Sequence, residues 1–303
     1  MTSLTFHTCD VFTETRFAGN PLAIVLGADD LSPAQMQTLA REFNLSETIF
    51  VQRPANPAHT ARVRIFFPTA EIPFAGHPTV GCAIHLATAT EGMGDFDRMI
   101  TLEEEAGLVP VRVWRKGGAV MAEFVAPVIP HGVTDARLLP VDRLAAALGL
   151  TATDIGFGKH QPAIWQGGPR YIFVPLASLD ALGRARSIEP AWADLTEAAG
   201  AAKVYLYAKG EDCDFRARMF GPGDGVPEDP ATGSASAILA AQLLASGVLG
   251  EGENRFALHQ GVEMGRPSEI GLTVQVAGGQ LTEVRIAGSA VPVSEGRIIA
   301  PAG

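Results

Sequence analysis

The sequence predicts an α+β protein of two similar domains, each with a mainly antiparallel sheet or barrel wrapped around a central apolar helix. The first observation is a repeated plan: stretches 71–87 and 228–241 each run from a turn with an acid, Pro and Thr into an apolar helix. The second is an Arg-x-Phe-x-Pro motif, which starts at Arg64 and again at Arg218, about half the chain apart. A helix without a polar face needs apolar cover on every side, and a curled sheet provides it.

Each helix entrance is a candidate anion site. The first N–H groups of a helix have no partner inside the helix and point outward, which suits a carboxylate or another anion. We expect these groups near Thr79 in the first turn and near Thr232 in the second, because each Thr follows its motif at nearly the same distance. The two turns suggest one kind of site built twice.

Composition fits a globular protein. The chain has 303 residues, 47% hydrophobic and 18% charged, enough for one large core or two ordinary ones. Its net charge of −10 comes from 33 acidic and 23 basic residues, and no basic cluster is interleaved with aromatics, so we expect no nucleic-acid partner. No stretch approaches the ~18 apolar residues of a membrane span, and residues 1–7 lack the pattern of a charged segment followed by an apolar run. We expect no membrane partner and a cytoplasmic location.

The three cysteines predict reduced thiols rather than a disulfide framework. Cys9, Cys82 and Cys213 are odd in number, far apart and without a Cys-x-x-Cys pair. Cys82 lies inside the first apolar helix, and we place Cys9 and Cys213 in strands. All three are interpreted as inert core thiols.

The first half of the chain predicts alternating strands and helices. Ser32 is the expected N-cap of a helix that starts at Pro33 and runs to about Asn44, with Gln35 completing a capping box. Strands are expected at 4–12, 22–26, 47–51 and 62–67, and the first apolar helix at 77–90. A hairpin should join 109–114 to 119–125 through Gly117-Gly118.

A linker at 126–132 divides the chain into two predicted domains. The first comprises 1–125, joined by the C-terminal segment 290–303, and the second comprises 126–289. The second domain should contain a helix at 141–148 ended by Gly149, a helical region near 189–200, strands at 162–166, 171–175 and 203–208, and paired strands in the Gly-rich ending from 271.

Three polar residues are candidates for chemistry, each with an ordinary alternative. Glu47 begins a strand next to Phe43 and Ile49; it is either a surface Glu or a general acid/base whose pKa an apolar wall raises. His77 at a helix entrance is either a capping or core histidine or a ligand-facing one. Asp229 before the second helix is either an N-cap or part of a site.

Several other chemistries are disfavoured. Ser46 and Ser234 do not lie in Gly-x-Ser-x-Gly, which argues against a serine hydrolase. The Gly-rich segments 156–159 and 221–225 lack the spacing of nucleotide-binding loops. The seven His residues show no His-x-x-x-His or Glu-x-x-His spacing, so we expect no metal. The turn cluster 260–268 either braces the second helix or places Arg266 near an anionic substrate.

Six motifs in order carry a family resemblance. They are Phe17-Ala-Gly-Asn-Pro21, Ser46-Glu47-Thr48, Arg64-x-Phe-x-Pro68, Phe74-Ala-Gly-His-Pro-Thr79, Asp229-Pro-Ala-Thr-Gly-Ser-Ala235 and Gln260-Gly-x-x-Met-Gly-Arg-Pro-Ser268. Over essentially its whole length the chain resembles the PhzF-like phenazine-biosynthesis isomerase family. The resemblance implies the diaminopimelate epimerase-like fold, an active site in the cleft between the two domains, a homodimer and no cofactor.

The resemblance also implies roles for residues of this chain. Glu47 matches the family's general acid/base, and His77 and Asp229 match further catalytic positions. The expected substrate-binding residues are Asn20, Ser46, Gly76, Thr79, Gly233 and Ser234. The implied reaction moves a proton between carbons of a small unsaturated carboxylic acid, for which trans-2,3-dihydro-3-hydroxyanthranilate is a possible substrate, and works by positioning and electrostatics.

Two alternatives stay open. Proline racemases and diaminopimelate epimerases look similar but use two opposed cysteines, and those positions fall on Ala75 and Ala231 here, so a two-thiol racemase is disfavoured. A one-base epimerase of an amino or hydroxy acid remains possible through Glu47. A non-catalytic protein that binds a small acid is the third reading.

Overall fold

The computed structural model describes residues 3–302, apart from the side chain of Asp224, and the chain divides into two units. Unit 1 comprises Met1–Pro127 and Ala287–Gly303, and unit 2 comprises Val128–Ile286. The last strand, β17 (Gln280–Ile299), therefore begins in unit 2 and continues in unit 1.

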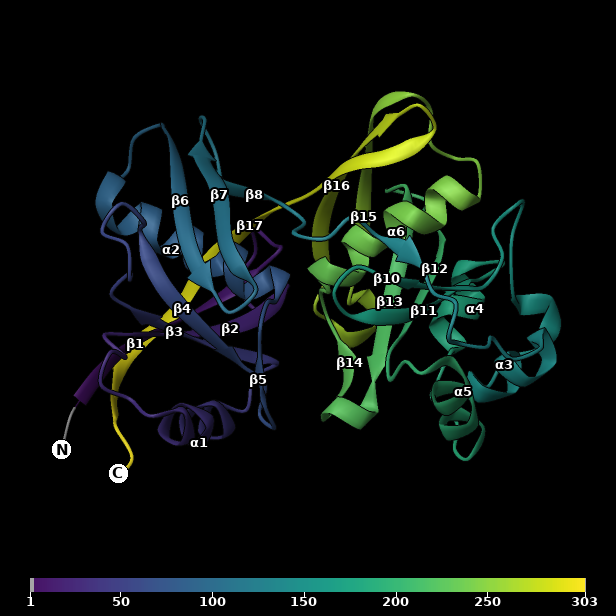
Figure 1. Ribbon diagram of the computed structural model, residues 1–303, viewed down its shortest axis with the longest axis horizontal. Helices are drawn as coiled ribbons and strands as arrows, with labels where there is room; N and C mark the ends of the chain where they lie inside the picture. Colours follow the sequence, from purple (N-terminus) through teal and green to yellow (C-terminus); the bar gives the residue numbers. More distant parts are fainter. Residues whose placement is uncertain (1–2, 303) are drawn as a thin grey trace. The chain divides into compact units, whose positions relative to one another are not determined.

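Unit 1 is a mainly antiparallel sheet around one helix (Figure 1). Its elements are β1 (Ser3–Val11), β2 (Asn20–Leu26), α1 (Pro33–Phe43), β3 (Glu47–Gln52), β4 (Ala61–Phe66), β5 (Glu71–Ile72), α2 (Gly76–Glu91), β6 (Phe96–Glu104), β7 (Gly107–Arg115) and β8 (Val120–Val125). The β2–β3 and β4–β6 pairs are parallel, whereas β1 is antiparallel to both β2 and β17.

Helix α2 is the centre of unit 1. It contacts β1, β2, β3, β6, β7 and β8, and ten of its residues are buried, among them Val80, Cys82 and Ile84. Gly81 has no room for a side chain, because a Cβ there would lie 2.7 Å from atoms of both Leu22 and Val11. The predicted apolar helix within a curled sheet is confirmed.

Helix α1 lies on the outside of this sheet (Figure 1) and shows how local signals set its ends. Ser32 accepts from the backbone N–H of Gln35, whose side chain accepts in turn from the N–H of Ser32, as the capping box predicts. Asn44 ends the helix in the left-handed region, with φ of 51°, so the chain reverses directly into β3.

Unit 2 repeats the plan and adds small helices. Its elements are β9 (His131–Gly132), α3 (Val141–Ala147), η1 (Ala152–Asp154), β10 (Ala163–Gln166), β11 (Arg170–Pro175), α4 (Leu179–Arg184), α5 (Ala191–Ala199), β12 (Val204–Lys209), β13 (Phe215–Gly221), η2 (Pro222–Asp224), β14 (Val226–Asp229), α6 (Gly233–Ala245), β15 (Gly252–Gln260), η3 (Val262–Met264) and β16 (Ser268–Ala277). Helix α6 contacts β9, β10, β11 and β16. A second apolar core lies under α3, α4 and α5, with Trp192 and Phe220 in edge-to-face contact.

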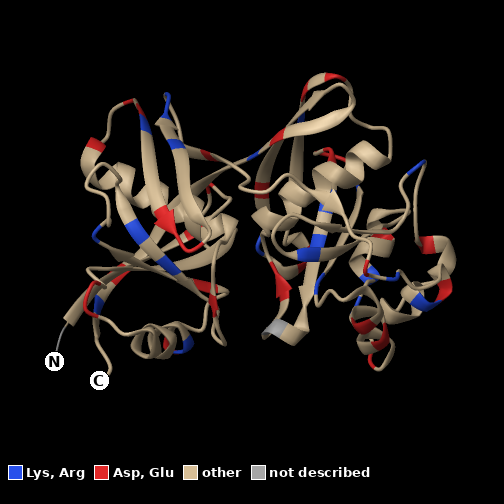
Figure 2. Ribbon diagram, in the orientation of Figure 1, with Lys and Arg blue, Asp and Glu red and all other residues tan. Residues whose placement is uncertain are grey.

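Charged residues of both signs are interspersed in both units (Figure 2). Many form local pairs, such as Arg112 with Asp97 and Arg143 with Asp194, whose side chains are about half exposed. Exposed pairs of this kind contribute little to stability, so the fold depends mainly on the buried apolar surfaces.

Three sequence-based expectations are corrected. Cys213 is not in a strand but in the bend between β12 and β13, where it is half-buried. Thr79 and Thr232 are not equivalent: Thr79 is the fourth residue of α2, whereas Thr232 is the N-cap of α6. Strand β6 was not expected, because charged residues at both faces of its first half hide the alternation typical of a strand.

Candidate active site

Glu47 is the first residue of β3, immediately after the turn that ends α1. It is only 7% exposed, and its neighbour in the parallel pairing with β2 is the fully buried Leu22. Ser46, the residue before it, is half-buried. The ordinary reading of Glu47 as a surface Glu is therefore wrong.

His77 and Glu47 lie together although they are 30 positions apart in the sequence. Nδ1 of His77 is 3.3 Å from Oε2 of Glu47, and His77 is 3% exposed. Burial lowers the pKa of His77 to about 3, against a smaller opposing effect of a hydrogen bond with the Pro21 carbonyl. The imidazole is thus neutral near pH 7, with one nitrogen able to donate and the other able to accept.

The start of α2 places backbone N–H groups beside His77. Ala75 is the N-cap and has no capping side chain, so the N–H groups of Gly76 and His77 precede the first intrahelical bond. Pro78 has no N–H, and the N–H of Thr79 bonds the Ala75 carbonyl at 3.3 Å. The helix entrance therefore offers two backbone donors next to the buried His–Glu pair.

Two other expected contact residues of unit 1 are fully buried. Asn20 begins β2 opposite Val11 and has no exposed surface. The preceding Gly19 has a φ of 66°, and a Cβ there would lie 2.4 Å from the Val11 carbonyl oxygen, so only glycine fits this turn. Thr79 is also unexposed, and its hydroxyl bonds within the helix and with Glu104.

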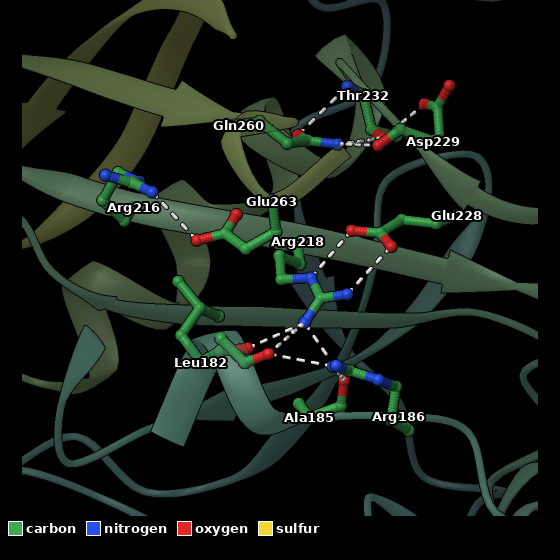
Figure 3. Close-up of polar contacts among 11 residues, drawn as sticks. Leu182, Ala185, Arg186, Arg216, Arg218, Glu228, Asp229, Thr232, Gln260 and Glu263 are labelled. Atoms are coloured by element: carbon green, nitrogen blue, oxygen red, sulfur yellow. Dashed lines mark hydrogen bonds and ion pairs between the residues drawn. The ribbon is translucent and has the colours of Figure 1, made fainter. Parts of the chain in front are cut away.

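In unit 2, Asp229 ends β14 and is tied to the entrance of α6 (Figure 3). The Thr232 hydroxyl donates to Oδ2 of Asp229 over 2.5 Å. Gln260 donates from Nε2 to the Asp229 carbonyl over 2.7 Å and accepts the Thr232 N–H at its Oε1 over 3.1 Å. Asp229 is therefore not the N-cap; Thr232 is, and Asp229 is held beside it.

Gly233 and Ser234 are the first two residues of α6, and their N–H groups precede its first intrahelical bond, from Ser236 to the Thr232 carbonyl. The Ser234 hydroxyl pairs with the Tyr171 hydroxyl at 2.9 Å. Both helices begin with Gly, so Thr232, the N-cap of α6, is the counterpart of Ala75, the N-cap of α2. The sequence motifs predict Ala231 at this position instead. Neither position carries a thiol.

The repeated Arg-x-Phe-x-Pro motif has a repeated structural role. Arg64 forms a bidentate pair with Glu71, and Arg218 forms one with Glu228 at 2.7 and 2.9 Å (Figure 3). Each guanidinium also lies over the aromatic ring of its motif. Arg64 is 5.4 Å from the ring centre of Phe66, and Arg218 is 4.7 Å from that of Phe220. Each pair thereby ties the segment before a helix entrance to a central strand.

Sequence reasoning missed three residues of these clusters. Gln260 braces Asp229 and Thr232, and its signal was only its place at the start of the turn cluster 260–268. Tyr171 reaches Ser234 from β11, and Glu104 reaches Thr79 from β6. Each comes from a strand distant in sequence, so no local pattern marks it.

Among residues 3–302, no helix is long and apolar enough to cross a membrane.

Comparison with known proteins identifies relatives over the whole length. Residues 9–296 match the family described as phenazine biosynthesis-like protein (PhzC-PhzF). An uncharacterized isomerase of Mesorhizobium japonicum is 44% identical, covering 95% of this chain and 96% of its own. The trans-2,3-dihydro-3-hydroxyanthranilate isomerase of Pseudomonas fluorescens is 38% identical over 96% of this chain and 97% of its own.

Solved structures agree. The PhzF-family phenazine biosynthesis protein of Bacillus anthracis is similar with a TM-score of 0.86 and 26% identity, covering 99% of this chain and 100% of its own. A hydroxyproline epimerase of Agrobacterium vitis shares the fold alone, with a TM-score of 0.63 and 14% identity over 98% and 91% of the two chains. The α+β fold predicted from the sequence is the diaminopimelate epimerase-like fold, and the chain belongs to the phenazine biosynthesis-like PhzC-PhzF family as one of its isomerases.

Proposed function

We propose that this isomerase moves a proton between two carbons of a small unsaturated carboxylic acid, with Glu47 as the general acid/base. The observation that carries the proposal is the buried pair of Glu47 and His77 beside the start of α2, where the first two N–H groups have no partner within the helix. The name of the Pseudomonas fluorescens relative supports trans-2,3-dihydro-3-hydroxyanthranilate as the substrate to test.

In the proposed mechanism, the Glu47 carboxylate takes a proton from a carbon adjacent to the unsaturated system. The double bonds shift, and the carboxylic acid of Glu47 returns a proton to another carbon, so no atom is gained or lost overall. The neutral His77 orients Glu47 and can pass a proton to or from it. The N–H groups of Gly76 and His77 bind negative charge on the substrate while it is delocalised.

Asp229 is proposed as a second catalytic residue, with Gly233 and Ser234 as substrate contacts. Its carboxylate is fixed by Thr232 and its backbone by Gln260, which is the preorganisation that a proton-handling or orienting group needs. Asn20, Ser46 and Thr79 are proposed to shape the substrate site of unit 1.

The test is conversion of trans-2,3-dihydro-3-hydroxyanthranilate in deuterated water, followed by NMR. We expect deuterium at the carbon that receives the proton. Glu47→Gln keeps the shape of the side chain and removes the base, so turnover should fall about a hundredfold or more. Glu42→Gln is the matched control, because Glu42 is an exposed Glu of the neighbouring helix, and it should keep full activity.

Other outcomes decide between the alternatives. Unchanged deuterium uptake in Glu47→Gln would remove Glu47 from the mechanism. Inversion at an α-carbon without a shift of double bonds would show a one-base epimerase. If the acid binds and leaves with no exchange at any carbon, it is a ligand and not the substrate.

A further inference from the structure

Asp212, Cys213 and His259 bring three different kinds of metal-ligand atom together in unit 2. Their donor atoms all lie within 4.8 Å of one another, and Oδ1 of Asp212 is 3.6 Å from Nδ1 of His259. None of the three belongs to the residues assigned above to the isomerase reaction. We propose that these side chains bind one divalent ion of the zinc type.

The Cys213 thiol is held in place by the shape of its turn. A Cβ on Gly210 would lie 2.5 Å from both the sulfur and the carbonyl oxygen of Cys213, so only glycine lets the thiol lie there. The thiol donates to the Phe215 carbonyl over 3.3 Å, which fixes its direction weakly. A bound metal ion would replace the thiol proton, which is released to water.

The turn is fastened to the strand that carries His259. The Asp214 N–H donates to the Ala257 carbonyl over 3.0 Å, and the Ala257 N–H donates to Oδ2 of Asp214 over 2.7 Å. Ala257 and His259 are two residues apart on β15, so they lie on the same face. The loop and the histidine are therefore positioned by the backbone and do not meet by chance.

The chemistry of the donor set favours zinc over magnesium or calcium. Thiolate and imidazole are ligands for Zn²⁺ and similar transition-metal ions, whereas Mg²⁺ and Ca²⁺ require oxygen. Ligand atoms in a tetrahedral zinc site are roughly 3.3–3.8 Å apart, given zinc–ligand distances of about 2.0–2.3 Å. The 3.6 Å separation of the Asp212 and His259 donor atoms already fits, and the sulfur, which lies within 4.8 Å of both, needs a shift of at most about 1 Å.

Charge and access also fit. One thiolate and one carboxylate balance the two charges of the ion. Arg216, the neighbour of His259 on β13, is paired with Glu263 at 2.9 Å (Figure 3), so its charge is compensated. The Asp212 side chain is 69% exposed and that of His259 22%, so an ion reaches the site from solvent. Three protein ligands leave a fourth position for water.

Cobalt(II) is the probe, because a cobalt–thiolate bond gives a charge-transfer absorption band. Cys9 and Cys82 are buried, so a band from the folded protein reports Cys213. We expect one Co²⁺ per chain, displaced by Zn²⁺.

The variants test each ligand. Cys213→Ser should abolish the band, and His259→Gln or Asp212→Asn should weaken binding at least about tenfold, since even partners of metal ligands have effects of this size. His131→Gln, at an exposed histidine of the same unit, should bind normally.

A second readout does not depend on cobalt. Cys213 should react with a thiol-specific disulfide reagent, and stoichiometric Zn²⁺ should slow this reaction in wild type but not in His259→Gln. The proposal is overturned if Co²⁺ gives no thiolate band, if Zn²⁺ binds only at millimolar concentration, or if Cys213→Ser binds it as tightly as wild type does. Because neither readout uses enzyme activity, the result is independent of the proposed isomerase reaction.

Discussion

The hydroxyl of Thr79 in α2 lies 2.7 Å from Oε1 of Glu104 in β6 and 2.8 Å from the carbonyl oxygen of Ala75. A hydroxyl has one hydrogen, so both contacts are satisfied only if Glu104 is protonated and donates to Thr79, which then donates to Ala75. The other Glu104 oxygen, Oε2, is buried without a hydrogen-bond partner among the described residues. Burial raises the pKa of Glu104 to about 8, which agrees with a neutral carboxylic acid.

Glu104 should make stability fall as pH rises. Its folded pKa of about 8 exceeds the ordinary value of 4.5, so the folded state binds this proton more tightly. The resulting stabilisation is full below about pH 4.5 and is lost as pH rises through 8. The free energy of unfolding of Glu104→Gln, measured in urea, should therefore rise relative to that of wild type between pH 5 and 9, by on the order of a few kcal/mol.

The adjacent Glu103 is the control for this prediction. Backbone N–H groups of Asn56 and Ala55, and then His59, hold the pKa of Glu103 at about 2. The Glu103 carboxylate is charged throughout the range from pH 6 to 9, so Glu103→Gln should lower stability at both pH values and should not become more stable than wild type at pH 9. If the stability difference between Glu104→Gln and wild type is the same at pH 6 and pH 9, Glu104 is already charged at pH 6.

His77 should make stability fall in acid. Its folded pKa of about 3 lies below the ordinary value of 6.5, so the unfolded chain takes up the proton first. The stabilisation present above pH 6.5 is lost as pH falls toward 3. His77→Gln should show a smaller loss between pH 7 and 5 than wild type in the same unfolding assay. An equal loss in both proteins would mean that His77 is charged in the folded state.

How much the sequence predicted depends on the range of each interaction. The start of α1 followed from Ser32, Pro33 and Gln35, which act on one helical turn, and the hairpin followed from two adjacent glycines. The apolar helices α2 and α6 followed from their apolar composition directly after a turn with an acid, Pro and Thr. These signals are local, so the chain states them directly.

The candidate site was predictable only in part. The resemblance named Glu47 and His77, but their 3.3 Å contact depends on how β3 packs beside α2. Gln260 was expected only as part of a turn cluster that could brace the second helix, because its bonds to Asp229 and Thr232 join segments that are distant in sequence. Cys213 was misplaced because a thiol between two strands has the same local pattern as one inside a strand.

The two motif arginines should differ in their effect on stability. The Arg218 side chain is 5% exposed, and beyond Glu228 its Nη1 donates to carbonyls at the end of α4, those of Leu182 and Ala185 among them (Figure 3). Lysine keeps the charge but cannot serve these partners at once. Arg218→Lys should cost about 2–4 kcal/mol in urea unfolding, because it leaves buried groups without partners.

Arg64→Lys is the matched variant in unit 1. Arg64 and Glu71 are more exposed, at 15% and 28% of their side chains, and the bidentate pair is the main contact of this guanidinium besides Phe66. We expect a loss of about 1 kcal/mol. Equal losses for the two variants would mean that the carbonyl contacts of Arg218 add nothing.

Gln260 should affect catalysis through Asp229. Gln260→Ala removes the partner of the Asp229 carbonyl and of the Thr232 N–H, both at a buried position. It should therefore lower the free energy of unfolding by about 1–3 kcal/mol. Because Asp229 and the start of α6 then lose their fixed geometry, kcat should fall while the fold persists.

Gln242→Ala is the comparison, since Gln242 is another buried glutamine of unit 2, bonded to Trp165 and Tyr207 instead. It should lower stability by a similar amount and leave kcat near the wild-type value; equal losses of kcat would show a general effect of destabilisation.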